Sequence, residues 1–477
     1  MTMDELPPEL LRQIFDAFNG PAPSDVRLHD QPEGDMLRDP ECPLKNISLV
    51  SKRWRAIALP VLFRNVVWTL EHCDQLLAKP TDDTDPVGGQ VPVLAFLRDN
   101  HLVRHVQSFT VIVYRGVAAA IPPIMPPIIP SSTMVYREDN DWLWNMLFTL
   151  MDPLRFTIIA SPQNLARLLG CDIFVGDADF FSHGERLHVL SLARDSRCAS
   201  TPASTPASTP ARPHQPLPSV ASSSQSTPGT SKRAANALVT IRPWTRLLLN
   251  ENSSICVYSS YHYFDRQSPS ILGNLLHGWD EASDHVFMVP PSLTSLSYIA
   301  IFPLMSQFRQ LVEHLPRIEQ LYLQIVPRNN IMLDKQEMGH VQPSDLWLER
   351  NGCYELVMRK LLSMRGSPIA ALANLDNSDD DDDDGDDDGQ DEDGGLGHVL
   401  LQHSPRKNWR YLRKFETGDS ADEEAWHSAV RVVKMSRTGW QVEQKGTFVK
   451  GPVPLEGDDD GFDDDSIDGD DPAFFGY

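Results

Sequence analysis

The chain has 477 residues, which exceeds a single hydrophobic core and predicts about three folded units at about 150 residues each. Its net charge of −24 is local, because residues 376–393 hold 13 acids and residues 456–471 hold 10, without a Lys or Arg, which leaves 43 acids against 42 bases elsewhere. The near-neutral remainder excludes a basic nucleic-acid footprint and a membrane-surface bias, so we expect neither nucleic acid nor a membrane as a partner.

The spacing of the cysteines and the apolar runs of the sequence predict an intracellular protein. The six cysteines follow no C-x-x-C spacing, so the sequence shows neither a zinc site nor a disulfide framework. No basic and apolar leader opens the chain, and the most apolar run, Val117 to Pro130, is broken by five prolines. We expect an intracellular protein of the cytoplasm or nucleus, with reduced thiols and with no metal or cofactor.

The N-terminal region, residues 3–68, opens with an amphipathic pattern. Apolar residues recur every three or four positions between residues 6 and 18, which predicts a helix, and Pro7-Pro8 fits only its first turn. A second apolar set at residues 44–59 predicts one or two further helices, interrupted at Pro60. We expect a small helical unit with more apolar surface than it can bury alone.

Two blocks of this region resemble the F-box family. Residues 6–15 read L-P-P-E-L-L-R-Q-I-F, similar to the family's L-P-x-E-L-L-x-x-I-F opening, and residues 49–55 read L-V-S-K-R-W-R, similar to its L-V-S-K-x-W core. The resemblance implies a three-helix module that docks onto the Skp adaptor of a Skp-cullin-F-box ubiquitin ligase, while the rest of the chain holds an unknown protein substrate. It also implies that the matched positions bind the adaptor: Leu6, Pro7, Leu10, Ile14, Phe15, Leu49, Val50, Lys52 and Trp54.

The departure from the family is an insert at residues 20–43, much longer than the usual connection and rich in Pro, Asp and Gly. We expect it to loop out, which leaves the docking angle of the second helix open. The apolar stripe also has an ordinary interpretation as core, and Leu11, Phe18 and Ile57 fit either role. A helix that binds in a partner's groove needs apolar anchors about one turn apart. Leu6, Leu10 and Ile14 supply two such i, i+4 steps, which favours the interpretation as a binding surface.

The middle of the chain reads as an array of strand and helix units. Apolar alternation predicts half-buried strands, and helical stretches precede several of them. The fold class is therefore α+β or α/β, and a degenerate leucine-rich-repeat-like region in two parts, 90–194 and 236–375, ranks above a compact α+β domain. Residues 242–276 and 311–330 look similar to segments of fungal F-box proteins with divergent leucine-rich regions. The predicted strands lie at residues 106–113, 187–192, 293–299 and 318–323, and the helices at 94–100 and 308–315.

Two further groups of side chains have a functional and a structural interpretation. His101 and His105 are spaced as two ligands on one helix face, but no third ligand is near, so ordinary surface or core histidines are the better interpretation. An aromatic-rich cluster would anchor a protein partner if exposed, or fill a sheet face if buried. The cluster consists of Trp244, Tyr258, Tyr261, Tyr263 and Phe264.

Three segments are too biased in composition to bury a core. Residues 195–235 form a Ser/Thr/Pro-rich disordered insert, whose four Thr-Pro sites are either kinase targets or chance. Residues 376–395 form an acidic linker and residues 453–477 an acidic tail. A calcium loop at Asp380 is disfavoured, because its twelfth position is Asp391 and no amphipathic helices flank it. The Thr-Pro sites are Thr201, Thr205, Thr209 and Thr227.

The chain returns to the fold between the acidic segments. We expect residues 396–452 to form a helix capped by Ser420 or Asp422, followed by a strand pair around Lys445-Gly446.

No catalytic constellation emerges from the sequence. It contains no G-x-S-x-G elbow, no phosphate-binding Gly loop and no H-E-x-x-H. We therefore expect a non-catalytic substrate receptor of a ubiquitin ligase that acts by proximity. The alternatives are a scaffold outside the ligase whose acidic segments bind basic proteins, and, more distantly, an enzyme with an unrecognised site.

Overall fold

The computed structural model covers most of the chain outside the biased segments. Residues 197–235 of the Ser/Thr/Pro insert with its Thr-Pro sites, the Asp380–Asp391 run and both acidic segments lie outside the described residues, whereas Asp195 at the start of the insert is described and pairs with Arg246. The described residues are 5–20, 22–33, 36, 42–77, 91–114, 133–134, 140–175, 177–181, 186–196, 237–276, 289–362, 405–436 and 438–451.

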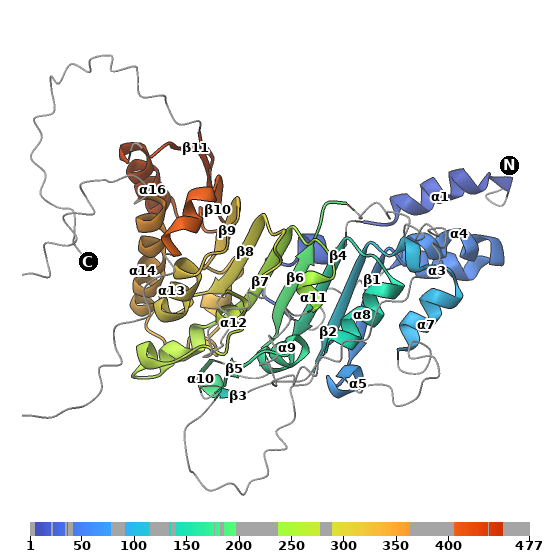
Figure 1. The fold of residues 1–477 in the computed structure, drawn as a ribbon, viewed down its shortest axis with the longest axis horizontal. Helices are drawn as coiled ribbons and strands as arrows, with labels where there is room; N and C mark the ends of the chain where they lie inside the picture. Colours follow the sequence, from blue (N-terminus) through green and yellow to red (C-terminus); the bar gives the residue numbers. More distant parts are fainter. Residues whose placement is uncertain are drawn as a thin grey trace, which may run out of the picture.

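Three helices form a small unit at one end of the molecule, opposite the C-terminal elements (Figure 1): α1 (Pro8–Ala17), α3 (Pro43–Val50) and α4 (Lys52–Leu62). Ser51 caps α4, because its hydroxyl accepts the N–H of Trp54 at 3.1 Å. The expected interruption at Pro60 is wrong, since Pro60 lies inside α4. A proline near the last turn removes one backbone donor, and the next turn still closes through the N–H of Phe63 to the carbonyl of Leu59 at 3.0 Å.

The described strands form a large mixed sheet, so the fold is α/β. Its ten strands lie in the order β1-β2-β4-β6-β7-β8-β9-β10-β12-β11, and all neighbours are parallel except around β6 and β12. The four strands predicted from alternation are confirmed as β2, β6, β8 and β9, but β2 and β6 are buried at every residue and not half-buried as expected, because both faces of the sheet are covered. The strands are β1 (Asn65–Leu70), β2 (Ser108–Val113), β4 (Arg155–Ala160), β6 (His188–Ala193), β7 (Arg246–Ser253), β8 (Ser295–Ile301), β9 (Gln320–Gln324), β10 (Lys414–Thr417), β11 (Trp440–Gln444) and β12 (Thr447–Lys450), with β3 (Thr133–Met134) and β5 (Ile173–Phe174) in a separate pair.

Helices between the strands cover one face of the sheet and enclose the main core with it. Phe156 on β4, for example, meets the rings of Trp144 and Phe148 edge-on at 5.7 and 5.3 Å. The predicted helices at 94–100 and 308–315 are confirmed as α7 and α13. The covering helices are α7 (Pro92–Asp99), α8 (Asp141–Leu150), α9 (Pro162–Leu169), α12 (Leu272–Leu276), α13 (Met305–Glu313), α14 (Pro343–Leu362) and α16 (Glu423–Met435).

The opposite face of the sheet carries a second, smaller core. Residues of the N-terminal insert contribute to it, since Leu28 and Met36 are buried there. The expectation that the insert loops out is therefore wrong for its described residues 22–33 and 36, because these apolar side chains gain by leaving water. Shorter elements complete the fold: α2 (Pro23–Val26), α5 (Asp74–Leu77), η2 (Val103–His105), α10 (Ala178–Phe181), α11 (Ala237–Thr240), η3 (Ile255–Ser259), η4 (Tyr263–Asp265), η5 (Ile331–Leu333) and η6 (Pro405–Tyr411).

The helix and the strand pair expected within residues 396–452 are present as α16, β11 and β12, and they follow η6 and β10, which were not expected. Asp422 caps α16 by accepting the N–H of Ala425 at 3.1 Å, and Gly446 turns the chain between β11 and β12 with φ of +84°. A side chain at Gly446 would also meet the carbonyl of Thr417 at 2.9 Å, so glycine is required twice over. None of the described helices is both long and apolar enough to cross a bilayer.

Candidate binding surfaces

The helical unit has a complete core of its own and still exposes apolar side chains. Leu11 and Phe15 on α1 are fully buried, together with residues of α3 and α4. Leu10 on the same helix is 44% exposed, and at the end of α3 Leu49 and Val50 are 75% and 62% exposed. The apolar surface predicted to exceed what the unit can bury is therefore present.

The structure divides the sequence-predicted adaptor positions into three groups. Phe15 is core, and its ring lies 5.5 Å from that of Trp54. Leu6, Ile14 and Trp54 are half-buried against that core. The exposed group consists of Pro7, Leu10, Leu49, Val50 and Lys52. Of the three ambiguous positions, Leu11 is buried, Phe18 is exposed and Ile57 is half-buried.

Hydrogen bonds and ion pairs hold the two matched blocks together. Arg53, at the start of α4, donates to the main-chain carbonyl of Leu6, just before α1. Arg64, just after α4, forms a 2.7 Å ion pair with Asp16 at the other end of α1. The helices α1 and α4 are thus joined at both ends, and Leu49 and Val50 enter the same unit through the tight α3–α4 junction at Ser51.

The second candidate surface is the sheet face opposite the helices, where alternate strand residues are polar. Thr157 on β4 is hydrogen-bonded to the hydroxyl of Ser191 on β6 at 2.9 Å. Residues 22–33 of the insert, here called the strap, lie against this face. Asp25 of the strap forms a 2.6 Å ion pair with Arg155, and His29 stacks on Tyr322 with ring centroids 4.5 Å apart.

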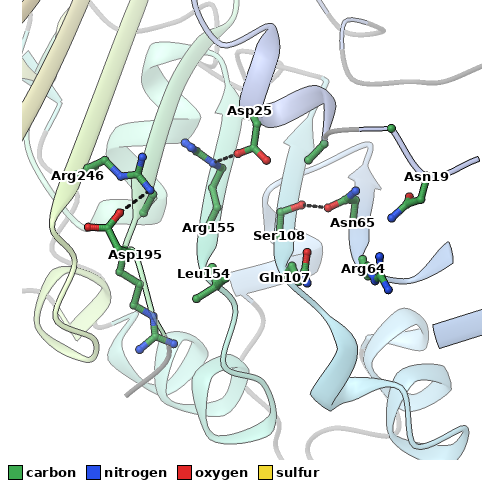
Figure 2. Close-up of a pocket in the computed structure, with 14 residues that line it drawn as sticks. Asn19, Asp25, Arg64, Asn65, Gln107, Ser108, Leu154, Arg155, Asp195 and Arg246 are labelled. Carbon is green, nitrogen blue, oxygen red and sulfur yellow. Dashed lines mark hydrogen bonds and ion pairs between the residues drawn. The ribbon is translucent and has the colours of Figure 1, made fainter. Parts of the chain in front are cut away.

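A cavity of about 410 Å³ opens beside the strap (Figure 2). Figure 2 shows Asp25 reaching from the strap to Arg155, with Arg246 and Asp195 paired next to it at 3.0 Å. Arg64 and Arg194 also line it. Burial lowers the pKa of Arg155, Asp25 opposes that shift, and the charge of Arg246 adds to it. With the strap in place, each of these four arginines is paired with a carboxylate of the chain, and Asp25 of the strap is the one that pairs with Arg155.

The aromatic cluster is split by the structure. Trp244 and Tyr258 are buried, whereas Tyr261 and Phe264 are 90% and 57% exposed. Tyr258 and Tyr263 lie in 3₁₀ turns, and only Trp244 precedes a strand, so the cluster does not fill one sheet face.

The paired histidines do not share a helix. His101 follows α7 with a left-handed φ of 56°, and His105 belongs to η2. No group of three or more metal-ligating side chains occurs among the residues placed by the structure.

Two buried acids are satisfied internally. Glu251 accepts hydrogen bonds from Tyr298 at 2.7 Å and Gln307 at 2.6 Å, and its burial raises its pKa. Asp419 accepts the N–H of Ile325 at 2.8 Å, and burial raises its pKa too. Both acids tie chain segments together.

Sequence reasoning missed the polar residues that hold the strap. Asn250 and Asn252 on β7 and Gln324 on β9 donate to main-chain carbonyls of the strap. The available signal was the polar end of the β7 sequence, R-L-L-L-N-E-N-S, where every residue after Arg246 is buried. Buried amides need hydrogen-bond partners, which here come from more than 200 residues away.

Comparisons of the chain with protein-family models, with curated proteins and with solved structures give no match.

Proposed function

We propose that this chain is the substrate-recognition subunit of a Skp-cullin-F-box type ubiquitin ligase and has no catalytic role itself. The observation that carries the proposal is the exposure of Leu10, Leu49 and Val50 on a unit whose own core is complete without them. These positions match the two F-box-like blocks. A partner that binds a helix requires apolar side chains that are exposed to solvent in the free protein.

The arrangement of the sheet supports the second half of the proposal. Strands β7, β8, β9 and β10 are parallel and adjacent in chain order, and α12, α13 and α14 lie between them in sequence. This succession is the one expected of a degenerate leucine-rich-repeat-like region. The polar face would hold the substrate, and the receptor would act by keeping a substrate lysine near the ubiquitin-loaded enzyme.

Adaptor binding by a double variant tests the proposal. Leu10→Ala combined with Val50→Ala removes two exposed anchors without touching the core of the unit. Binding of a purified Skp-type adaptor, measured by calorimetry, should weaken by about 2–4 kcal/mol, as for hot-spot truncations. The melting temperature should stay unchanged, because both side chains are already in water.

A matched control comes from a helix of the sheet region. Leu348 on α14 is 67% exposed and lies in the sheet region, so Leu348→Ala should leave adaptor binding as it was. The proposal fails if the folded double variant captures the adaptor as tightly as the native chain. It also fails if the native chain does not bind the adaptor.

A further inference from the structure

The strap is held mainly through its backbone. Asn250, which is 1% exposed, donates its two amide hydrogens to the carbonyls of Leu28 and Asp30, at 2.9 and 2.8 Å. Gln324 and Asn252 reach two further strap carbonyls at 3.4 Å each. Side-chain amides that bind carbonyls recognise a chain path independently of its sequence. No strap residue pairs with a strand in the described sheet, so these side chains provide the grip.

The backbone of β7 is irregular where the strap contacts it. Strand β7 shifts register between Asn250 and Ser253, and Asn252 has a left-handed φ of 66°. The N–H of Asn252 donates to the side-chain carbonyl of Asn250 at 3.1 Å, which leaves the amide hydrogens of Asn250 pointing at the strap. Bulges and left-handed non-glycine residues occur where a side chain must be aimed.

Three strap side chains add sequence preference to the backbone grip. Leu28 is 4% exposed within the smaller core, His29 stacks on Tyr322, and Asp25 reaches Arg155 at the arginine-lined cavity. Between them, Val26 is 60% exposed. Ala22, Ser24 and Pro32 are buried as well, so the strap packs along the face with three specific anchors in the order acid, apolar, ring.

We propose that this sheet face is a peptide-binding surface and that the strap is its built-in occupant. The external partner is a peptide segment with an acidic residue, a leucine three positions later and an aromatic or imidazole ring next to it, as in Asp25-x-x-Leu28-His29. This partner displaces the strap by taking over the same amide donors. Only the identification of that partner as a ligase substrate rests on the proposed function.

Binding of a strap peptide tests the inference directly. In the full chain, residues 22–33 are replaced by a Gly/Ser sequence of equal length, and a fluorescent peptide with the native 22–33 sequence is titrated in. The peptide should bind the replaced chain at least tenfold more tightly than the native chain. Adding Asn250→Leu to the replaced chain should remove at least tenfold of that affinity. A peptide with Leu28→Asp is the control and should not bind.

A second measurement uses the native chain, in case the replaced chain does not fold. Trypsin cleaves after Arg27, and an unlabelled Arg27→Gln peptide in excess should speed this cleavage severalfold by freeing the strap. The inference is overturned if a folded replaced chain fails to bind the peptide, or if saturating peptide leaves the cleavage rate unchanged. The adaptor experiment probes α1 and α3, so either proposal can fail alone.

Discussion

The two faces of the same sheet are built by different rules. On β4, Phe156 packs into a core of helix side chains, whereas its neighbours Arg155 and Thr157 point to the other face and bind through hydrogen bonds and an ion pair. On the helix-covered face, the helices are held by burial of apolar surface, and this interaction is strong but non-directional. The strap-covered face buries a smaller apolar core and adds directed contacts, namely the hydrogen bonds of Asn250 to the strap and the ion pair of Asp25 with Arg155. The larger core thus lies on the helix-covered face, and the directed contacts of the other face are the ones that the proposed peptide would take over.

The largest expected effect tests the helix-covered face. Phe156→Ala removes a ring that is 2% exposed and contacts three other aromatic rings, and should cost about 3–5 kcal/mol of unfolding free energy. Thr157→Val, one residue along on the other face, should cost only about 1 kcal/mol, the value of one net hydrogen bond. Urea denaturation measures both. Equal losses would contradict the difference between the faces.

The next effect is a pH dependence on the helix-covered face. Burial and the charge of Arg186 lower the pKa of His188 from 6.5 to about 3. At pH values between 3 and 6.5, His188 binds a proton in the unfolded chain but not in the folded chain. The free energy of unfolding is therefore highest above pH 6.5 and decreases as the pH falls below it. The slope should be up to about 1.4 kcal/mol per pH unit. Denaturation of His188→Gln between pH 7 and 4.5 should lack this component, and an identical pH profile would refute it.

A smaller effect is expected where Asn250 holds the strap. Asn250→Leu in the native chain removes two hydrogen bonds to the strap and should cost about 1–2 kcal/mol. The larger response should be local, with faster trypsin cleavage after Arg27 while the helix-covered face stays folded. Loss of global stability on the scale of Phe156→Ala would show that the strap is part of the fold.

The smallest effect is a weak acid sensitivity of the strap. Burial lowers the pKa of His29; the charges of Arg328 and Arg155 lower it further, and those of Asp30 and Glu416 oppose them. Its other neighbour is the ring of Tyr322. Because the bound form is the neutral one, lowering the pH below 6.5 favours release. The strap peptide should bind the replaced chain a few-fold more weakly at pH 5.5 than at 7.5. A peptide with His29→Phe keeps a ring without the proton and should show no such difference.

The predictions that the structure confirms rest on short stretches of sequence. Alternation over six or seven residues located β2, β6, β8 and β9, and the cap at Asp422 and the turn at Gly446 follow from single residues. The path of the strap was not predictable in this way. Leu28 is an apolar residue without periodic neighbours, and the residues on β7 and β9 that hold Leu28 and His29 lie more than 200 residues further along the chain.

The motif predicts which positions bind an adaptor, but it does not predict which of them are exposed. Leu10 and Leu11 read alike in the sequence, and only the approach of α4 decides that Leu11 turns inward. Phe15 matches the motif as well as Leu10 does, yet its ring is enclosed by Trp54 and the rest of the unit. The periodicity of the sequence predicts the apolar stripe, but the packing of the third helix decides which part of the stripe stays exposed to solvent.

The strap lies in the chain between α1 and α3, and this placement sets how hard it is to displace. A ligand tethered at both ends has an effective concentration in the millimolar range, whatever the concentration of the protein. A free peptide competes against that local concentration, so its apparent dissociation constant exceeds the intrinsic one by the ratio of closed to open chains. Peptides with few matching anchors therefore do not displace the strap, and only a peptide with a better set of anchors binds the sheet face.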